Sequence, residues 1–375
     1  DDAPPDPKER EAVETFRQML DTVRLLDTAK IHQDQVERLY RTRALFVNWT
    51  KSRLRAAMAD EQWLRIIKNG RDIGYSYITE KPAGGVPRPL KADEIRQGKS
   101  GAELAPPGDG VLVGIRARTM TPITPTRDNP NPKGEAQVDS STWMFVTPDR
   151  RLEDWSRITT VKDGTVDKDG KPVSRELDEF GSSSRQTVTS FDKFGMPGTQ
   201  LDPKQPPVRI QEDYELNVTT ITGTGASDPL NQQLPPWYLP QALGHLLPRL
   251  LPLEARADGA PKSYMFATYV PETRQVMTRY VDVGNPAMIN FNGRTQRAVP
   301  ISDRIGWHGS VTTHYMTLDG RYLGSENKDT HMLILPADGP TLLKIWKGAD
   351  LTKPGAVQRP RGSASAVSPG ATNGR

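Results

Sequence analysis

The hairpin that decides the fold reads Ile67-Lys68-Asn69-Gly70-Arg71-Asp72-Ile73-Gly74. An Asn-Gly pair favours a two-residue turn with positive φ, and that turn joins antiparallel strands. The pattern returns as Thr317-Leu318-Asp319-Gly320-Arg321-Tyr322-Leu323-Gly324, and Asn292-Gly293-Arg294 repeats its first half. The later glycine of each full copy predicts a β-bulge or close packing. Two sheet halves built alike would produce this echo, and so would the chance recurrence of a favourable turn.

Short runs of β-branched and aromatic residues, separated by turn dipeptides such as Asp163-Gly164, continue from Glu61 onward. The predicted strands are residues 63–68, 111–118, 142–147, 186–191, 214–222, 264–270, 276–283, 311–318, 331–335 and 342–346. Many short strands with close turns are typical of antiparallel sheets. We therefore predict a mainly β (α+β) fold, with a large curved antiparallel sheet or half-barrel.

Two helices are predicted before the first strand. In residues 8–29 the apolar residues recur at helical spacing, at Val13, Phe16, Leu20, Val23 and Leu26. Residues 31–58 predict a second helix, which carries six basic residues and no acid between Arg38 and Arg55. The first helix is acidic, so the opposite charges predict an antiparallel helical hairpin. The basic strip could instead serve an anionic partner.

One further helix interrupts the strands. The segment Pro235-Pro236-Trp237-Tyr238-Leu239-Pro240 leads into residues 241–251, where five leucines form a broad apolar face. Pro248 lacks a backbone donor and should kink or shorten this helix. Since so apolar a segment needs a surface to lie on, we expect it in the concavity of the sheet.

These patterns divide the chain into five segments. They are a disordered start at 1–7, a helical hairpin at 8–60, a first antiparallel sheet half at 61–232, the leucine helix with a second sheet half at 233–350, and a disordered basic tail at 351–375. The tail holds Lys353, Arg359, Arg361 and Arg375 and no acid, so it accounts for the whole net charge of +4. It could touch a polyanion, although a solvated tail is the simpler interpretation.

Composition and the absence of known motifs exclude several kinds of functional site. The 375 residues include no cysteine, which excludes disulfides, thiolate metal sites and cysteine nucleophiles. No apolar run reaches the ~18 residues of a membrane-spanning helix. The common nucleophile, zinc-protease, phosphate-loop and dinucleotide motifs are absent, and Gly223-Thr224-Gly225 lacks the third glycine. We therefore predict that the protein is not an enzyme and binds no cofactor. A hydrolase that uses His314 or His331 in a site of unrecognised type is left open as an alternative.

Two groups of residues have some features of a metal site. Asp167, Asp169 and Glu176 fall at the third, fifth and twelfth positions of a calcium loop, but Thr165 replaces its first acid. A plain acidic turn fits better. His308, His314 and His331 lie near neighbouring predicted strands and could hold zinc, yet surface or core histidines are the simpler interpretation. We predict no metal.

Aromatic residues and methionines gather in the half that follows the leucine helix, and such side chains suit an adaptable apolar pocket. The predicted ligand-binding residues are Trp237, Leu243, Leu247, Tyr264, Phe266, Met277, Phe291 and Met316. An ordinary core would use the same residues. A nucleic-acid partner is not expected, because Arg and Lys are not interleaved with these aromatics.

The first residues, Asp1-Asp2-Ala3-Pro4-Pro5-Asp6-Pro7, are acidic, rich in proline and without an initiator methionine. Such a start is typical of what signal-peptide cleavage leaves, and trimming of a longer chain would also give it. We expect a bacterial protein exported to the periplasm or beyond.

The second half also resembles a known superfamily. The proline-rich leucine helix is followed by Ser263-Tyr264-Met265-Phe266, by a strand ending Tyr280-Val281-Asp282-Val283-Gly284, by Tyr315–Arg321 and by a closing strand at 333–336. Over residues 234–346 this order is similar to the lipoprotein-carrier (Lol-type) half-barrels and their uncharacterised periplasmic relatives. The resemblance implies a curved sheet that wraps a helix and often holds an acyl chain. The polar loops at 80–109 and 127–139 and the first helices depart from that pattern.

The leading hypothesis is thus an exported, non-catalytic half-barrel that binds an apolar ligand, such as a lipid or acyl chain, or an apolar partner segment. The alternative is a structural subunit of a larger envelope or extracellular complex, assembled through sheet edges and the basic helix.

Overall fold

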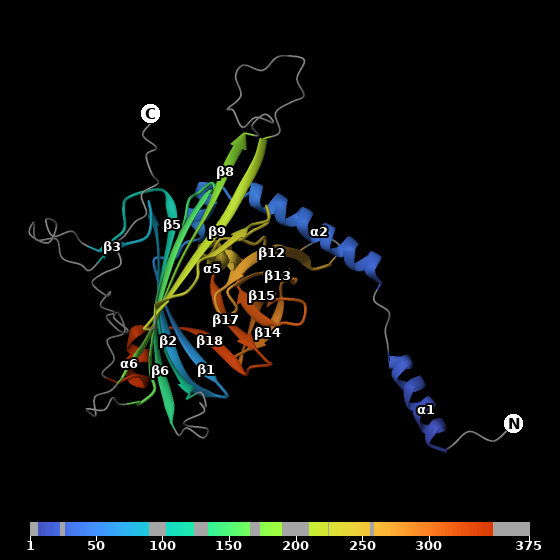
Figure 1. Ribbon diagram of the computed structural model, residues 1–375. Coiled ribbons are helices and arrows are strands. Elements are labelled where there is room, and N and C mark those ends of the chain that lie inside the picture. The colour runs from blue at the N-terminus through green and yellow to red at the C-terminus, as the bar shows by residue number, and fades with distance from the viewer. Residues whose placement is uncertain are drawn as a thin grey trace, which may run out of the picture.

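The computed structural model describes residues 7–22, 27–89, 103–123, 134–165, 173–189, 210–223, 225–255 and 259–347. They form a curved, unclosed sheet of sixteen strands around a central helix (Figure 1). The strand order is β10-β9-β8-β7-β6-β5-β2-β1-β18-β17-β16-β15-β13-β12, with β11 beside β9 and β14 beside β15. The predicted mainly β, antiparallel half-barrel is confirmed. The predicted start and the tail at 351–375 lie largely or wholly outside the described residues.

The first half of the sheet is a meander of mainly long strands, with two short strands at its end. It contains β1 (Glu61–Lys68), β2 (Arg71–Ala83), β5 (Gly110–Pro122), β6 (Glu135–Val146), β7 (Leu152–Lys162), β8 (Arg175–Thr189), β9 (Ile210–Thr222), β10 (Gly225–Ala226) and β11 (Leu230–Gln233). A separate small ribbon pairs β3 (Arg88–Pro89) with β4 (Glu103–Leu104).

The second half is a meander of shorter strands. It contains β12 (Lys262–Val270), β13 (Gln275–Val283), β14 (Ala287–Phe291), β15 (Arg294–Ile305), β16 (Thr312–Met316), β17 (Tyr322–Asn327) and β18 (Met332–Ala337). The two halves join where β1 pairs with β18, with Trp63 opposite Ala337 and Lys68 opposite Met332. Both predicted halves therefore belong to one continuous sheet.

The two copies of the repeated hairpin share a bulge but differ in their turns, because Gly320 has φ of 86° whereas Asp319 does not occupy the left-handed region. Asn69 and Gly70 have φ of 51° and 77°, so both occupy the left-handed region that this turn requires. The register then shifts between Ile66 and Ile67, opposite Gly74. An added Cβ at Gly74 would lie 2.2 Å from the carbonyl oxygen of Arg118, so only glycine fits there. The β16–β17 hairpin shifts in the same way opposite Gly324. The predicted bulges are thus present in both copies.

The N-terminal helices are α1 (Pro7–Thr22), α2 (Thr28–Val47) and α3 (Lys51–Ala57). The single helix expected at 31–58 is divided because Thr50 caps α3, accepting a hydrogen bond from the Arg53 backbone N–H at 3.3 Å. The predicted helical hairpin is wrong for the described residues. Val13 and Phe16 of α1 are 61% and 62% exposed, and Figure 1 shows α1 clear of the body.

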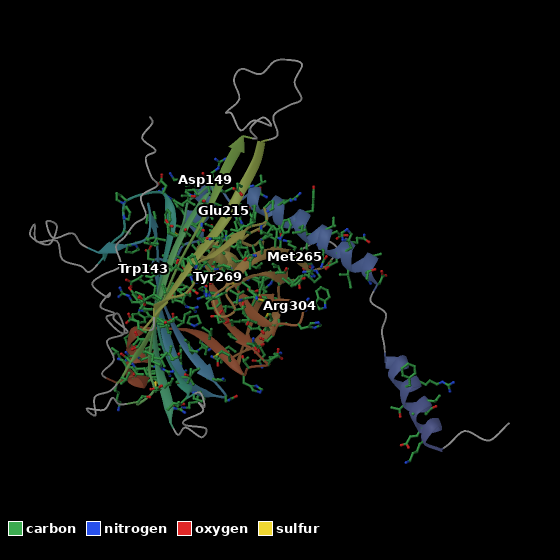
Figure 2. All side chains as sticks on the ribbon, in the orientation of Figure 1. Trp143, Asp149, Glu215, Met265, Tyr269 and Arg304 are labelled. Carbon is green, nitrogen blue, oxygen red and sulfur yellow. The ribbon has the colours of Figure 1, made fainter. Side chains whose placement is uncertain are left out.

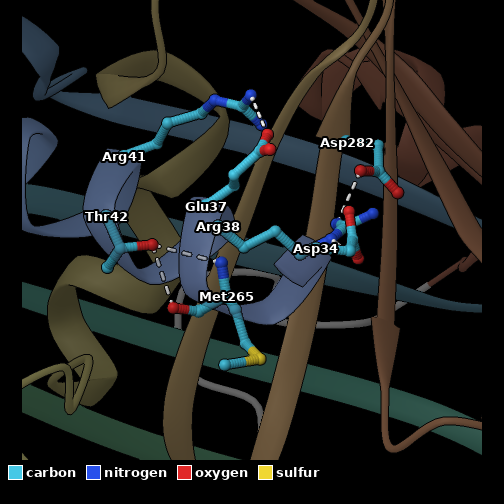
Figure 3. Close-up of polar contacts among 7 residues, drawn as sticks. All are labelled: Asp34, Glu37, Arg38, Arg41, Thr42, Met265 and Asp282. Atoms are coloured by element: carbon cyan, nitrogen blue, oxygen red, sulfur yellow. Dashed lines mark hydrogen bonds and ion pairs between the residues drawn. The ribbon is translucent and has the colours of Figure 1, made fainter. Parts of the chain in front are cut away.

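Helix α2 packs against the sheet instead of against α1, since its charged and polar groups find partners there. Arg38 donates to Asp34 on its own helix and to Asp282 of β13, each at 2.7 Å (Figure 3). The buried Thr42 hydroxyl donates to the carbonyl of Met265 at 2.9 Å and accepts from the Met265 N–H at 3.1 Å. These bonds cover part of the free edge of β12, which would otherwise be open to another strand.

Helix α5 (Gln241–Leu250) lies in the concavity, as the sequence predicted. Its leucines are fully buried, and Pro248 is accommodated inside the last turn. The last element, α6 (Gly339–Ile345), corrects the strand predicted at 342–346. Asp338 caps this helix, accepting from the Thr341 N–H at 2.7 Å, and Leu342 packs on Tyr75 at the outer face of the sheet.

Candidate functional site

A cavity of about 310 Å³ lies between α5 and one wall of the sheet. Its apolar lining consists of Leu64, Ile66, Ile78, Ile115, Ala117, Pro248, Met316 and Ile334. Its polar lining consists of Gln62, Ser76, His245, Arg249, Thr312, His314, Tyr322 and Ser325. Since the wall is made by β5, β2, β1, β18, β17 and β16, the cavity lies across the junction between the two halves of the sheet.

The lining follows from strand alternation. Successive side chains of a strand point to opposite faces, so Leu64 and Ile66 of β1 face the cavity. Ile67 faces outward and packs with Phe291 of β14 and Tyr315 of β16 in a separate outer cluster. The sheet is therefore apolar on both faces here, with α5 and the cavity on one side and the β14–β15 hairpin on the other.

The C-terminal part of α5 is anchored by the buried carboxylate of Glu80 in β2. His245 Nε2 lies 2.8 Å from Glu80 Oε1, and the Arg249 guanidinium donates to both carboxylate oxygens, at 2.5 and 2.8 Å. The Ala59 N–H donates to Oε2 at 2.6 Å and the Gln62 amide donates to Oε1 at 2.9 Å. Burial alone would raise the pKa of Glu80, but the hydrogen bonds and charges of His245 and Arg249 lower it to about 2.

A second buried ion pair holds the middle of α5. Arg279 of β13 donates to the carboxylate of Asp303 in β15 and, at 3.4 Å, to the carbonyl of Gly244. His314 Nε2 lies 3.7 Å from Asp303 Oδ2. Burial opposes ionisation of Asp303, yet Arg279 and His314 hold the pKa of this carboxyl well below its usual range. The two histidines of the cavity are thus each backed by an arginine-paired carboxylate.

The N-terminus of α5 meets a third buried carboxylate, that of Glu153 in β7. Glu153 accepts from the Gln241 N–H, from the Tyr238 hydroxyl at 3.1 Å and from the Ser183 hydroxyl at 3.0 Å. All of these described donors are neutral. Burial raises the pKa of Glu153 to about 7, because these hydrogen bonds only partly offset the lost hydration.

The segment before α5 bridges the two ends of the strand path. Its Leu234 N–H donates to Tyr214 of β9 at 2.7 Å, and its Leu239 N–H donates to Ala267 of β12 at 2.8 Å. Tyr269, labelled in Figure 2, adds a bond from its hydroxyl to Glu179 of β8 at 3.1 Å. The edge of β12 is therefore covered by α2 and by this segment, and α5 is fixed between the two halves.

The eight predicted ligand-binding residues occupy different places. Leu243, Leu247, Tyr264, Phe266 and Met316 belong to the main core, and Trp237 packs against that core. Phe291 lies in the outer cluster with Tyr315, their ring centroids 4.4 Å apart. Met277 is half-buried and accepts a contact from the Thr273 hydroxyl at 3.7 Å. Of the eight, Met316 lines the cavity described above, and the proposed ligand role of the set stays a prediction.

Sequence reasoning missed the residues that shape the site on α5. His245 and Arg249 stand four residues apart in an otherwise apolar helix, a spacing that puts both on one face. Two basic side chains on a buried helix indicate a buried acid as their partner. That acid, Glu80, belongs to a strand far away in the sequence, and spacing cannot identify it.

The three histidines considered for zinc do not converge. His314 faces the cavity, whereas His308 is an exposed loop residue and His331 is exposed in the turn before β18, with φ of 52°. Of the calcium-loop candidates, Asp167 and Asp169 lie outside the described residues. Glu176 lies in β8.

Comparisons with known proteins assign this chain to no family. No family model matches the chain, and no curated protein matches it. One solved structure that matches is titled "Crystal Structure of Beta-barrel-like Protein of Domain of Unknown Function DUF1849 from Brucella abortus". It has a TM-score of 0.38 and 11% identity, and the match covers 75% of this chain and 98% of that one. The resemblance to the lipoprotein-carrier superfamily stays a prediction.

Among the described residues, none of the helices combines the length and the apolar character that a bilayer span requires.

Proposed function

We propose that this protein is an exported, non-catalytic binding protein that holds an apolar ligand, a lipid or an acyl chain, inside its half-barrel. The observation that carries the proposal is the cavity of about 310 Å³ between α5 and the sheet. Its volume lies near the lower limit of small-molecule sites, which occupy roughly 300–1,000 Å³. Five aliphatic side chains of the wall give it the apolar surface that an acyl chain requires: Leu64, Ile66, Ile78, Ile115 and Ile334.

The placement of α5 supports binding over simple core packing. The helix is anchored by Glu80, by Arg279 through the Gly244 carbonyl and by Glu153, so it cannot move sideways into the space beside it. Close-packed interiors contain few voids larger than a water molecule. Because α5 is anchored along its length, it keeps this space open, and an open apolar space favours ligand binding over core packing.

The two carboxylates near the cavity are poorly suited to general acid–base catalysis. General acids and bases work best when their pKa lies near the operating pH. Glu80 and Asp303 are instead held ionised by their arginines, with pKa values far below neutrality. The open hydrolase alternative named His314 or His331, and of these His331 lies exposed on a turn, away from the cavity.

Mass spectrometry tests the proposal. We expect the purified protein to carry a stoichiometric apolar ligand, seen as an added mass in the native spectrum and identified after organic extraction. The variant Thr312→Phe places a large ring in the cavity and should remove that added mass. Thr313→Phe is the matched control, because the neighbouring position in β16 has the opposite side-chain direction.

An empty wild-type protein that also binds no added acyl chain would overturn the proposal. Equal ligand content in Thr312→Phe and Thr313→Phe would move the ligand to another site, such as the predicted set around Phe266. Export to the periplasm or beyond is part of the proposal, and fractionation of the producing bacterium tests it.

Assembly into a larger complex is a second candidate, which one observation favours. Val36, Tyr40 and Val47 of α2 are 51%, 75% and 81% exposed, and their spacing puts them on one face of the helix, where exposed apolar residues that gather in a patch mark interaction sites. Light scattering of the purified protein would show self-association, and Tyr40→Ser with Val47→Ser should abolish it. A monomer in both cases would contradict this candidate without affecting the cavity.

A further inference from the structure

We propose that the cavity selects amphiphiles with an anionic head, of the carboxylate class, and that His245 and His314 recognise this head. The inference rests on the proposed function and deepens it, since it concerns the same cavity. It adds what the apolar wall cannot supply, a preference among ligands that share one hydrocarbon chain.

The first observation is the sign of the charges at the lining. Among the described residues that line the cavity, Arg249, His245 and His314 are basic and none is acidic. The nearest carboxylates stand behind them. Glu80 is paired with Arg249, and Asp303 is paired with Arg279, so each negative charge already has a guanidinium of its own. The described lining therefore presents these three basic side chains to a ligand, with no carboxylate among them.

The second observation is how the histidines are held. Each imidazole has about one-fifth of its side-chain surface exposed, at 20% for both His245 and His314. His245 Nε2 is engaged by Glu80, and no described protein group bonds its Nδ1. His314 Nε2 faces Asp303, while its Nδ1 is buried without a partner. Each ring is thus held through one nitrogen only.

The third observation is the arrangement of these groups. His245 and Arg249 lie one helical turn apart on α5, and His314 lies on β16, a strand against which α5 packs. A head placed between helix and strand would meet basic groups from both sides. The chain would then extend along Ile115, Ile66 and Ile334 of the same sheet wall.

Physical chemistry fixes the class of head. Bonds from a cationic donor to a carboxylate are about twice as strong as neutral ones, and the difference grows in a site that excludes water. A cationic head would meet Arg249 and two histidines without a facing acid. A neutral hydroxyl head would gain hydrogen bonds but no charge pairing. The lining therefore ranks a carboxylate above a hydroxyl and a hydroxyl above a quaternary ammonium.

The experiment compares three ligands with the same twelve-carbon chain: dodecanoate, 1-dodecanol and dodecyltrimethylammonium. Each is titrated, below its micelle concentration or solubility limit, into full-length wild-type protein from which any co-purified ligand has been removed, and native mass spectrometry verifies that removal. We expect dodecanoate to bind at least ~10-fold more tightly than dodecanol, a ratio that corresponds to one charge-assisted bond. The ammonium compound should bind most weakly.

The outcomes separate the two proposals. Equal binding of all three ligands, or tightest binding of the ammonium compound, would overturn the head preference and leave the apolar pocket intact. No binding of any of them would overturn the proposed function and, with it, this inference.

A variant tests which residue recognises the head. His314→Asn should weaken dodecanoate binding by about 10-fold and leave dodecanol binding within about twofold. His308→Asn is the matched control, because His308 is exposed and away from the cavity. An equal loss for dodecanoate and dodecanol in His314→Asn would show a structural role only, and would overturn the assignment of His314 to the head.

Discussion

The two ends of α5 rest on buried glutamates that lie in opposite electrostatic surroundings. At the C-terminal end Glu80 accepts from Arg249 and His245, and its pKa falls to about 2. At the N-terminal end Glu153 accepts from a backbone N–H and two hydroxyls, and its pKa rises to about 7. Burial acts on both groups in the same direction. The comparison shows that the sign of the pKa shift is decided by whether the partners carry charge.

The same substitution at the two glutamates should have very different effects. Glu80→Gln leaves the Arg249 cation buried without its counter-charge, and we expect a loss of about 3–5 kcal/mol in the free energy of unfolding. Glu153→Gln keeps an oxygen acceptor and removes a charge that has no described cationic partner, so we expect a change within about 1 kcal/mol at pH 7.5. Urea denaturation of both variants measures the two values. Similar losses at both positions would break the comparison.

The pH dependence of stability should also have opposite signs at the two ends. The pKa of Glu153 is raised from 4.5 to about 7, so its contribution to stability is complete below pH 4.5 and is lost as the pH rises through 7. The pKa of Glu80 is lowered from 4.5 to about 2, so its contribution is present above pH 4.5 and is lost on acidification. Each shift corresponds to roughly 3 kcal/mol.

Denaturation of the wild type and of Glu153→Gln at pH 4.5, 6 and 8 checks this sign. The wild type should lose stability relative to the variant as the pH rises, and a constant difference between the two would show that Glu153 does not titrate in this range.

A double variant tests whether the unpaired Arg249 cation causes the loss of stability in Glu80→Gln. If the unpaired guanidinium causes the loss in Glu80→Gln, then adding Arg249→Met should restore about 1–2 kcal/mol, because no uncompensated cation is then buried. Arg53→Met in the same background is the control, since Arg53 binds the Leu250 carbonyl at 3.0 Å and does not contact Glu80. Recovery in the control, or none in the double variant, would assign the loss to packing.

Much of the fold could be predicted from local patterns. The Asn69-Gly70 turn and the bulge at Gly74 depend on residues that are adjacent in sequence, and the leucine face of α5 depends on its own periodicity. The helix at 339–345 was mistaken for a strand because a short apolar run has no decisive period. The signals that separate the two are Asp338 as the helix cap and Pro340 in the first turn.

Less of the candidate site than of the fold could be predicted from the sequence. The predicted ligand residues were chosen as large and apolar, and such residues fill the core more often than they line a cavity. The cavity lining mixes aliphatic side chains with small ones, such as Ala117 and Ser76, and with polar ones, and of the predicted residues it includes Met316. The carboxylates that hold α5 come from β2, β7 and β15, and their meeting depends on strand order, which no local pattern encodes.

The pairing of β1 with β18 has a consequence for how the chain reaches this structure. Every other pairing along the main strand path joins strands close together in sequence, so each half can form its meander as it is synthesised. Strand β1 is among the first elements that are synthesised. It pairs with β2 on one side and with β18 on the other, and β18 (Met332–Ala337) is among the last elements that are synthesised. Contacts between residues so far apart form slowly, because a long loop must be closed first. Until β18 arrives, the edge of β1 and its apolar residues stay unpaired on the growing chain, which is when this protein is most exposed to mispairing with a second copy.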